Sequence, residues 1–153
     1  IESTIVDCTR GAPVLLRPGG IDRTQVEAVC GQRLRDRGEL GGSVPRASGT
    51  LLAHYAPSAP LRLMDAKALQ TALDLLGADA AHIALYARTP LKTRSNRVEC
   101  RRMPDDAAAT AQQLFAVLRD FDARGVRLIW VETPPDTPEW EAVRDRLSRA
   151  AAA

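Results

Sequence analysis

A long stretch without hydrophobic periodicity divides this chain and limits the folds open to it. Turn-forming residues recur through residues 36–58: Gly38, Gly41, Gly42, Pro45, Gly49 and Pro57. Such residues interrupt helices and strands. Loops inside compact domains rarely exceed about 15 residues. We therefore expect two structural units, residues 1–35 and 60–153, joined by a linker at 36–59 that is either a domain boundary or a functional loop.

Residues 60–153 alternate between short apolar runs and amphipathic segments. Runs at 61–64, 82–87, 97–103 and 126–131 have the length and composition of strands. The run at 126–131 (VRLIWV) is dense enough in β-branched and aromatic residues to be a central strand covered on both faces. Strands that alternate with helices usually form a parallel sheet between helical layers. We expect an α/β fold, a small three-layer domain with a mostly parallel sheet.

Three helices are predicted among these strands. Asp65 is the expected N-cap of the first, Asp105 and Asp106 open the second, and Thr137 with Pro138 starts the third. The stripes expected to be buried are Leu69, Leu73 and Leu76, then Ala111, Leu114, Phe115, Leu118 and Phe121, and last Trp140, Val143 and Leu147.

Residues 1–35 have the pattern of two strands and one short helix. IESTIVDC has strand-forming residues from its first position, and the second strand, 14–17, ends at Pro-Gly-Gly. Asp22 can cap a helix ending near Gly31, with Val26, Val29 and Cys30 on one side. A hairpin and one helix bury too little surface to fold alone. We expect this unit to be the end of a larger domain that begins upstream of residue 1.

The charge balance of the whole chain does not indicate a nucleic-acid binder. Lys and Arg number 21 against 19 Asp and Glu. One segment is locally basic, with Glu99 as its opposing charge: Arg88, Lys92, Arg94, Arg97, Arg101 and Arg102. This segment could bind RNA phosphate. It could equally be a solvated loop and edge strand whose cations discourage pairing with other chains.

Cysteine and histidine spacing argues against a metal site and against disulfides. Cys8, Cys30 and Cys100 are far apart and odd in number, and His54 and His82 have no acidic neighbour at ligand spacing. Reduced thiols are typical of a cytoplasmic protein. The apolar runs are far shorter than the ~20 residues that cross a bilayer, so no membrane association is expected.

A few polar residues could form a site. Arg17 ends a strand before Pro-Gly-Gly, where a guanidinium and free amides can hold phosphate, although a solvated arginine is also common there. Ser3 offers a strand hydroxyl, and Glu132 follows the strongest strand at the edge where α/β sheets bind ligands. His54 and Tyr55 are unusual in a linker and could form a lid over a neighbouring site.

Five segments together resemble a known enzyme family. ESTIVD, LLRPGGI, SGTLLAHYAPSAPL, AQQLFAVLRDFD and IWVETPPDTPEWEAVRDRLSRAA are similar, in this order, to the C-terminal portion of two-domain threonylcarbamoyl-AMP synthases. In that family a YrdC-like catalytic domain is followed by a linker and a small Rossmann-like domain. The resemblance implies that residues 1–35 are the end of the catalytic domain and 60–153 the complete Rossmann-like domain. Ser48-Gly49 stands where relatives have Pro-Gly.

The resemblance also implies a reaction. The family makes threonylcarbamoyl-AMP and pyrophosphate from L-threonine, bicarbonate and ATP, with Mg²⁺ expected alongside the nucleotide, for the modification of an adenosine in tRNA. Ser3 would lie near threonine and phosphate, Arg17 would contact the nucleotide, and Tyr55 with His54 would form the lid. The catalytic residues are expected upstream, so the chain alone should be inactive. Residues 60–153 would either bind tRNA or a partner protein, or anchor the linker.

Overall fold

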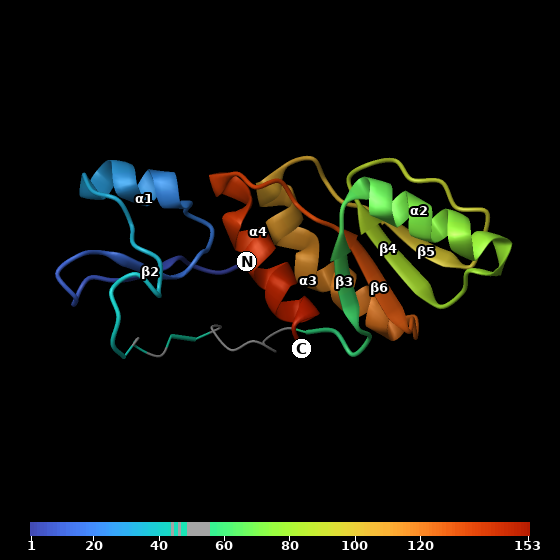
Figure 1. The fold of residues 1–153 in the computed structure, drawn as a ribbon, viewed down its shortest axis with the longest axis horizontal. Coiled ribbons are helices and arrows are strands. Elements are labelled where there is room, and N and C mark those ends of the chain that lie inside the picture. The colour runs from blue at the N-terminus through green and yellow to red at the C-terminus, as the bar shows by residue number, and fades with distance from the viewer. Residues whose placement is uncertain (44, 46, 49–55) are drawn as a thin grey trace.

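The structure is a computed structural model that describes residues 1–43, 45, 47–48 and 56–153. The first part contains β1 (Ile5–Asp7), β2 (Val14–Arg17) and α1 (Arg23–Cys30). The second part contains β3 (Leu61–Met64), α2 (Ala66–Leu76), the 3-10 turn η1 (Gly77–Asp79), β4 (Ile83–Ala87), β5 (Val98–Arg102), α3 (Ala107–Ala123), β6 (Leu128–Glu132), the 3-10 turn η2 (Pro138–Trp140) and α4 (Glu141–Ala151). Figure 1 shows the smaller part beside α4.

The second part is built on a four-stranded parallel sheet, as expected. Its strand order is β3-β6-β4-β5, and every neighbouring pair is parallel. The strand predicted to be central, β6, lies between β3 and β4. The predicted strand at the basic segment, β5, is an edge strand. The fold class, a three-layer α/β domain, is therefore confirmed.

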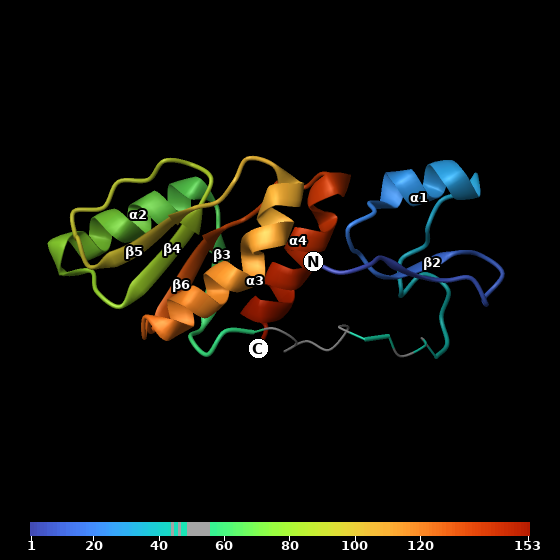
Figure 2. The same ribbon diagram turned by 180° about the vertical axis from the view of Figure 1, so that it is seen from behind.

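Helices cover both faces of this sheet (Figures 1 and 2). Ala84 and Tyr86 of β4 join one core with residues of α3 and α4, whereas Ile83, Leu85 and Ala87 join the other core with Leu69 and Leu73 of α2. This alternation is the two-residue period of a strand. Successive side chains of β4 therefore bind the two helical layers to one sheet.

Two details of the predicted helices are wrong. Leu76 was expected in the buried stripe of α2, but it is 41% exposed, because it is the last helical residue and Leu73 already completes the stripe. Thr137 was expected to cap the last helix, but its side chain makes no capping hydrogen bond. A 3-10 turn starting at Pro138 comes first, and it buries Trp140 ahead of α4.

The first part has the expected hairpin and capped helix. β1 pairs antiparallel with β2. The carboxylate of Asp22 caps α1 in a reciprocal box with Gln25, and Gly31 ends the helix with a left-handed φ of 69°. No residue of α1 is buried and Val29 is 89% exposed, although Val26 is half-buried, so the described residues cover the apolar side of this helix only in part.

Candidate functional site

Ser3 and Arg17, which were selected from the sequence, are in direct contact. Arg17 ends β2 and is only 5% exposed. Its Nε and Nη2 donate to the Ser3 carbonyl oxygen at 3.2 and 2.9 Å, and Nη2 lies 3.4 Å from Ser3 Oγ. Its Nη1 donates to the carbonyl oxygen of Ser48 at 2.9 Å. One buried guanidinium thus joins the first segment of the chain to the linker.

The Pro-Gly-Gly loop after Arg17 presses against the same first segment. A Cβ atom on Gly19 would lie 2.3 Å from the Thr4 nitrogen and 2.5 Å from the Glu2 oxygen, so only glycine fits there. The Gly20 amide donates to the Glu2 carbonyl at 3.0 Å, and the Thr4 hydroxyl donates to Ile21 O. Residues 2–4 lie outside β1, contrary to the expected strand from residue 1, because they pair with this loop instead.

Helix α4 reaches the same segment through Arg146, which the sequence did not single out. Arg146 is 2% exposed. Its Nη2 donates to Glu2 Oε2 at 3.1 Å and to the Pro18 carbonyl at 3.2 Å, while Nη1 donates to Asp145 at 2.6 Å. A signal was available, because position 146 lies on the same helix face as Val143, Leu147 and Ala150.

A second ionic bridge joins the two parts. The guanidinium of Arg23, in α1, donates to both carboxylate oxygens of Glu141 at 3.2 and 2.8 Å and also pairs with Asp36. These hydrogen bonds, above all those to Glu141, raise the pKa of Arg23 above its ordinary value. Both bridges tie residues 1–36 to the N-terminal half and middle of α4.

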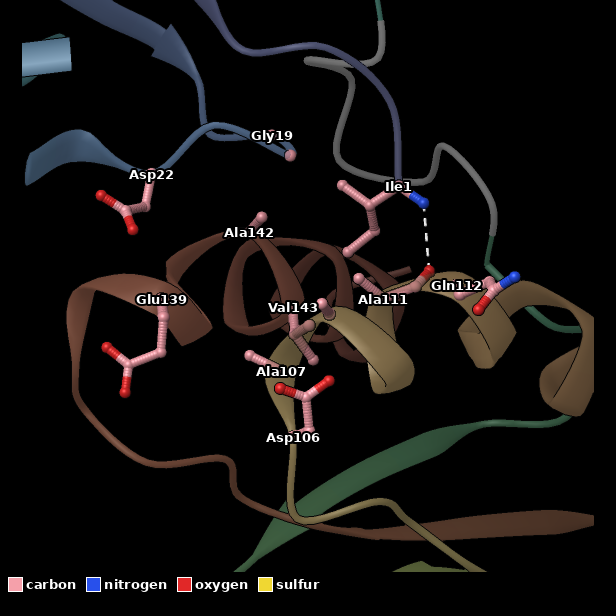
Figure 3. Close-up of a pocket in the computed structure, with 12 residues that line it drawn as sticks. Ile1, Gly19, Asp22, Asp106, Ala107, Ala111, Gln112, Glu139, Ala142 and Val143 are labelled. Carbon is pink, nitrogen blue, oxygen red and sulfur yellow. Dashed lines mark hydrogen bonds between the residues drawn. The ribbon is translucent and has the colours of Figure 1, made fainter. Parts of the chain in front are cut away.

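A pocket of about 530 Å³ opens between the first part and the helices (Figure 3). Ile1 and Gly19 lie on one side of it, opposite the small residues Ala107, Ala111 and Ala142, and Gly20 and Ala108 also line it. Asp22, Asp106 and Glu139 lie around one side of it. Two of these carboxylates are occupied as N-caps, Asp22 of α1 and Asp106 of α3.

Glu132 lies at the carboxyl edge of the sheet, as expected, but its carboxylate is already occupied. It is 5% exposed and accepts hydrogen bonds from the amides of Arg88 and Thr89 at 2.7 Å each, from the Thr89 hydroxyl at 2.9 Å and from the Arg88 guanidinium at 3.2 Å. The Arg88 guanidinium also lies 5.5 Å from the centre of the Trp140 ring. Glu132 therefore ties the loop after β4 to the end of β6.

Half of the cations in the basic segment have acidic partners. Arg88 pairs with Glu132, Arg101 with Asp120 and Arg102 with Asp105. The hydrogen bond from Arg101, followed by that from Arg124, holds the pKa of Asp120 below its ordinary value. The exposed ends of Lys92 and Arg94 are left to supply positive charge on the loop between β4 and β5.

The remaining expectations concern the lid, the cysteines, metal binding and membrane spans. His54 and Tyr55, the predicted lid, lie outside the described residues. The three cysteines are exposed free thiols, and the described residues contain no group of three His, Cys, Asp or Glu side chains that could hold a metal ion. Among the described residues, every helix is too short or too polar to cross a bilayer.

Comparison with known proteins agrees with the resemblance. Residues 21–152 match the family model "Threonylcarbamoyl-AMP synthase, C-terminal domain". The chain is 31% identical to threonylcarbamoyl-AMP synthase of Bacillus subtilis and 30% identical to that of Pyrococcus abyssi; the matches cover 99% and 98% of the chain but 45% of each relative. The chain thus spans less than half the length of these relatives.

Two solved structures share the fold. The structure of P. abyssi Sua5 complexed with L-threonine is 29% identical and matches 98% of the chain with a TM-score of 0.78. A variant of the same protein, in which an adjacent histidine and tyrosine are replaced by alanine, is 25% identical and matches 99% with a TM-score of 0.77. Each match covers 45% of the solved chain.

Proposed function

Because the chain belongs to the threonylcarbamoyl-AMP synthase family, matching its C-terminal domain, we propose that it acts within an enzyme that makes threonylcarbamoyl-AMP. The reaction would consume L-threonine, bicarbonate and ATP and release pyrophosphate. The product would supply the threonylcarbamoyl group for tRNA modification in the cytoplasm. The names of the relatives and the threonine complex of one of them support this proposal.

The observation that carries the proposal at the site is the contact between Ser3 and Arg17. Both were assigned to substrate binding from the resemblance, and a guanidinium 2.9 Å from the Ser3 carbonyl places them side by side. We assign Ser3 the task of orienting threonine through its hydroxyl, and Arg17 that of stabilising phosphate charge beside it. The Arg17 guanidinium already donates to the Ser3 and Ser48 carbonyls, so it would act on phosphate through its positive charge in a site that excludes water.

The linker would complete the site. Arg17 holds the Ser48 carbonyl, directly before the segment that contains His54 and Tyr55. We propose that this segment closes over the bound substrates and keeps water from the reactive carbamate and adenylate. Mg²⁺ would arrive with ATP and neutralise its phosphates, and the remaining basic and catalytic groups would come from outside this chain.

The test is pyrophosphate release that depends on both L-threonine and bicarbonate. A longer protein that carries this chain, of the length of the curated relatives, should show it, whereas the chain alone should not. Arg17→Ala should raise the KM for ATP, and Tyr55→Ala should lower turnover or release intermediate. Threonine-dependent release by the chain alone, or unchanged kinetics in both variants, would contradict the proposal.

A further inference from the structure

We propose that Arg146 is a positioning residue through which helix α4 holds the Ser3–Arg17 pair in its working geometry. This inference rests on the proposed function, because it assigns Arg146 a task in substrate binding. It would give residues 60–153 a specific role: they would set the position of a binding site that lies on residues 1–20.

Burial is the first argument. Arg146 is 2% exposed and lies on the apolar face of α4, where an arginine is unfavourable unless its charge is paired and its N–H groups are bonded. Two of its three partners, Glu2 and the Pro18 carbonyl, belong to the other part of the chain. Within α4 the charge is paired with Asp145, and both contacts of Nη2 join the two parts, whereas the buried Nε has no partner among the described residues.

The positions of those partners are the second argument. Glu2 directly precedes Ser3, and Pro18 directly follows Arg17. The two contacts, 3.1 and 3.2 Å from the same Nη2 atom, therefore hold the residues next to both members of the pair. Arg17 itself bonds Ser3 at 2.9 Å, which closes the network.

This arrangement predicts what a shift at Arg146 would do. If Glu2 and Pro18 move away from α4, Ser3 and Arg17 move with them, and Arg17 also holds Ser48 of the linker. A displacement of about 1 Å in a binding site can cost up to roughly a hundredfold in kcat/KM. The effect should appear in substrate binding even when the three-layer domain stays folded.

Arg144 provides a matched control on the same helix. Its guanidinium bonds the carbonyls of Pro135 and Thr137 and pairs with Asp136 at 3.1 Å. All three partners lie within residues 60–153. Arg144→Lys therefore tests the loss of an arginine from α4 with its hydrogen bonds confined to residues 135–137.

The experiment compares Arg146→Lys with Arg144→Lys in the longer protein that carries this chain. Lysine keeps the charge but has a single head group in place of the guanidinium fork, so it should lose at least one of the contacts across the two parts. We expect Arg146→Lys to raise the KM for L-threonine roughly tenfold with kcat within about threefold, and Arg144→Lys to leave KM within about twofold. Equal KM changes in both variants, or none in either, would overturn the inference.

Amide hydrogen exchange on the 153-residue chain gives an independent readout. The Gly20 amide, which donates to Glu2 O, should exchange faster in Arg146→Lys, while Ile129 in the sheet should not change.

If Arg146→Lys also exposes Ile129, it has unfolded, and Glu2→Ala takes its place because it removes a partner without altering α4. Glu2→Ala must then raise the KM for threonine, or the inference fails. If the unmodified longer protein shows no threonine-dependent activity, the proposed function is contradicted. The positioning contact is tested separately, because unchanged exchange of the Gly20 amide in Arg146→Lys would overturn it.

Discussion

Gly19 shows how one residue type can be required by the backbone opposite it. Its Cα faces residues 2–4 so closely that an added Cβ would lie 2.3 Å from Thr4 N and 2.4 Å from Ser3 C. Both are backbone atoms, so they cannot rotate away as a side chain would. The close approach brings the loop after Arg17 onto the segment that carries Ser3.

Gly19→Ala should therefore destabilise the chain by about 1–3 kcal/mol, the usual cost of overpacking. Gly38→Ala is the control, because nothing lies within 4 Å of its added Cβ and its φ is not in the left-handed region. Thermal denaturation of the two variants measures the difference. Equal midpoints would mean that residues 2–4 do not pack on the loop as described.

Among single residues, the sequence identified Ser3 and Arg17 but did not identify Glu2 or Arg146. Ser3 and Arg17 lie in short motifs whose resemblance to a known family makes them candidates for substrate binding, and that role stays a prediction. Arg146 lies in a helix rich in arginine, and although its position on the apolar face distinguishes it from the half-buried Arg144, the local sequence does not show which partners a buried arginine there would have. Its partners outside α4 depend on the first part of the chain lying against α4.

At the scale of the elements, hydrogen bonds at helix caps and strand ends determine local stability. α1 has no buried residue, so little tertiary packing supports it and its N-terminal cap carries more of its stability. Asp22 accepts from the Gln25 amide at 2.9 Å and from the Thr24 hydroxyl at 2.6 Å. These bonds, with that from Thr24 the stronger, lower the pKa of Asp22.

The stability that Asp22 gives α1 should therefore depend on acid. A carboxyl whose pKa is lower in the folded state contributes fully above its unfolded pKa of about 3.9, and this contribution is lost as pH falls through the lower folded value. Asp22→Ala should cost α1 about 1 kcal/mol at neutral pH, whereas Asp22→Asn should keep most of the cap without its acid dependence. NMR titration of the Gln25 amide measures this, and identical titrations in the unmodified chain and Asp22→Asn would contradict it.

Glu132 stabilises the carboxyl ends of β4 and β6 together. Glu132→Gln replaces one acceptor oxygen by an amino group that faces buried N–H donors, so about 2–3 kcal/mol of stability should be lost. Glu139→Gln, on an exposed glutamate, should change stability by less than about 0.5 kcal/mol. Chemical denaturation compares the two, and a Glu132→Gln chain as stable as the unmodified one would show that its carboxylate is free.

At the scale of the whole molecule, the distribution of charge predicts weak binding to tRNA. Carboxylates offset three of the six cations between 88 and 102, which leaves about three to contact phosphate. The logarithm of the binding constant should then fall with the logarithm of salt concentration with a slope of only about 2 to 3 in magnitude. A slope near 5 would instead support a tRNA-binding role for this segment. Lys92→Ala should reduce the magnitude of this slope, and Arg88→Ala should leave the slope unchanged.

The elements of this protein follow largely from its local sequence. Among the described residues, hydrophobic periods and caps predicted the strands, the three long helices and the parallel sheet, because propensity, burial pattern and hydrogen-bonded ends act within a few residues. Two expectations fail at the ends of elements. Leu76 is not buried because it is the last residue of α2, and Thr137 does not cap α4 because a 3-10 turn comes between them.

The docking of residues 1–36 against α4 was decided only by the tertiary structure. The contacts of Arg146 with Glu2 and of Arg23 with Glu141 span more than a hundred residues of chain. No local pattern encodes such a pair, since each partner alone is an ordinary charged residue. Their value arises when packing takes Arg146 out of water and partly shields its partners, and this places Ser3 and Arg17 relative to the rest of the protein.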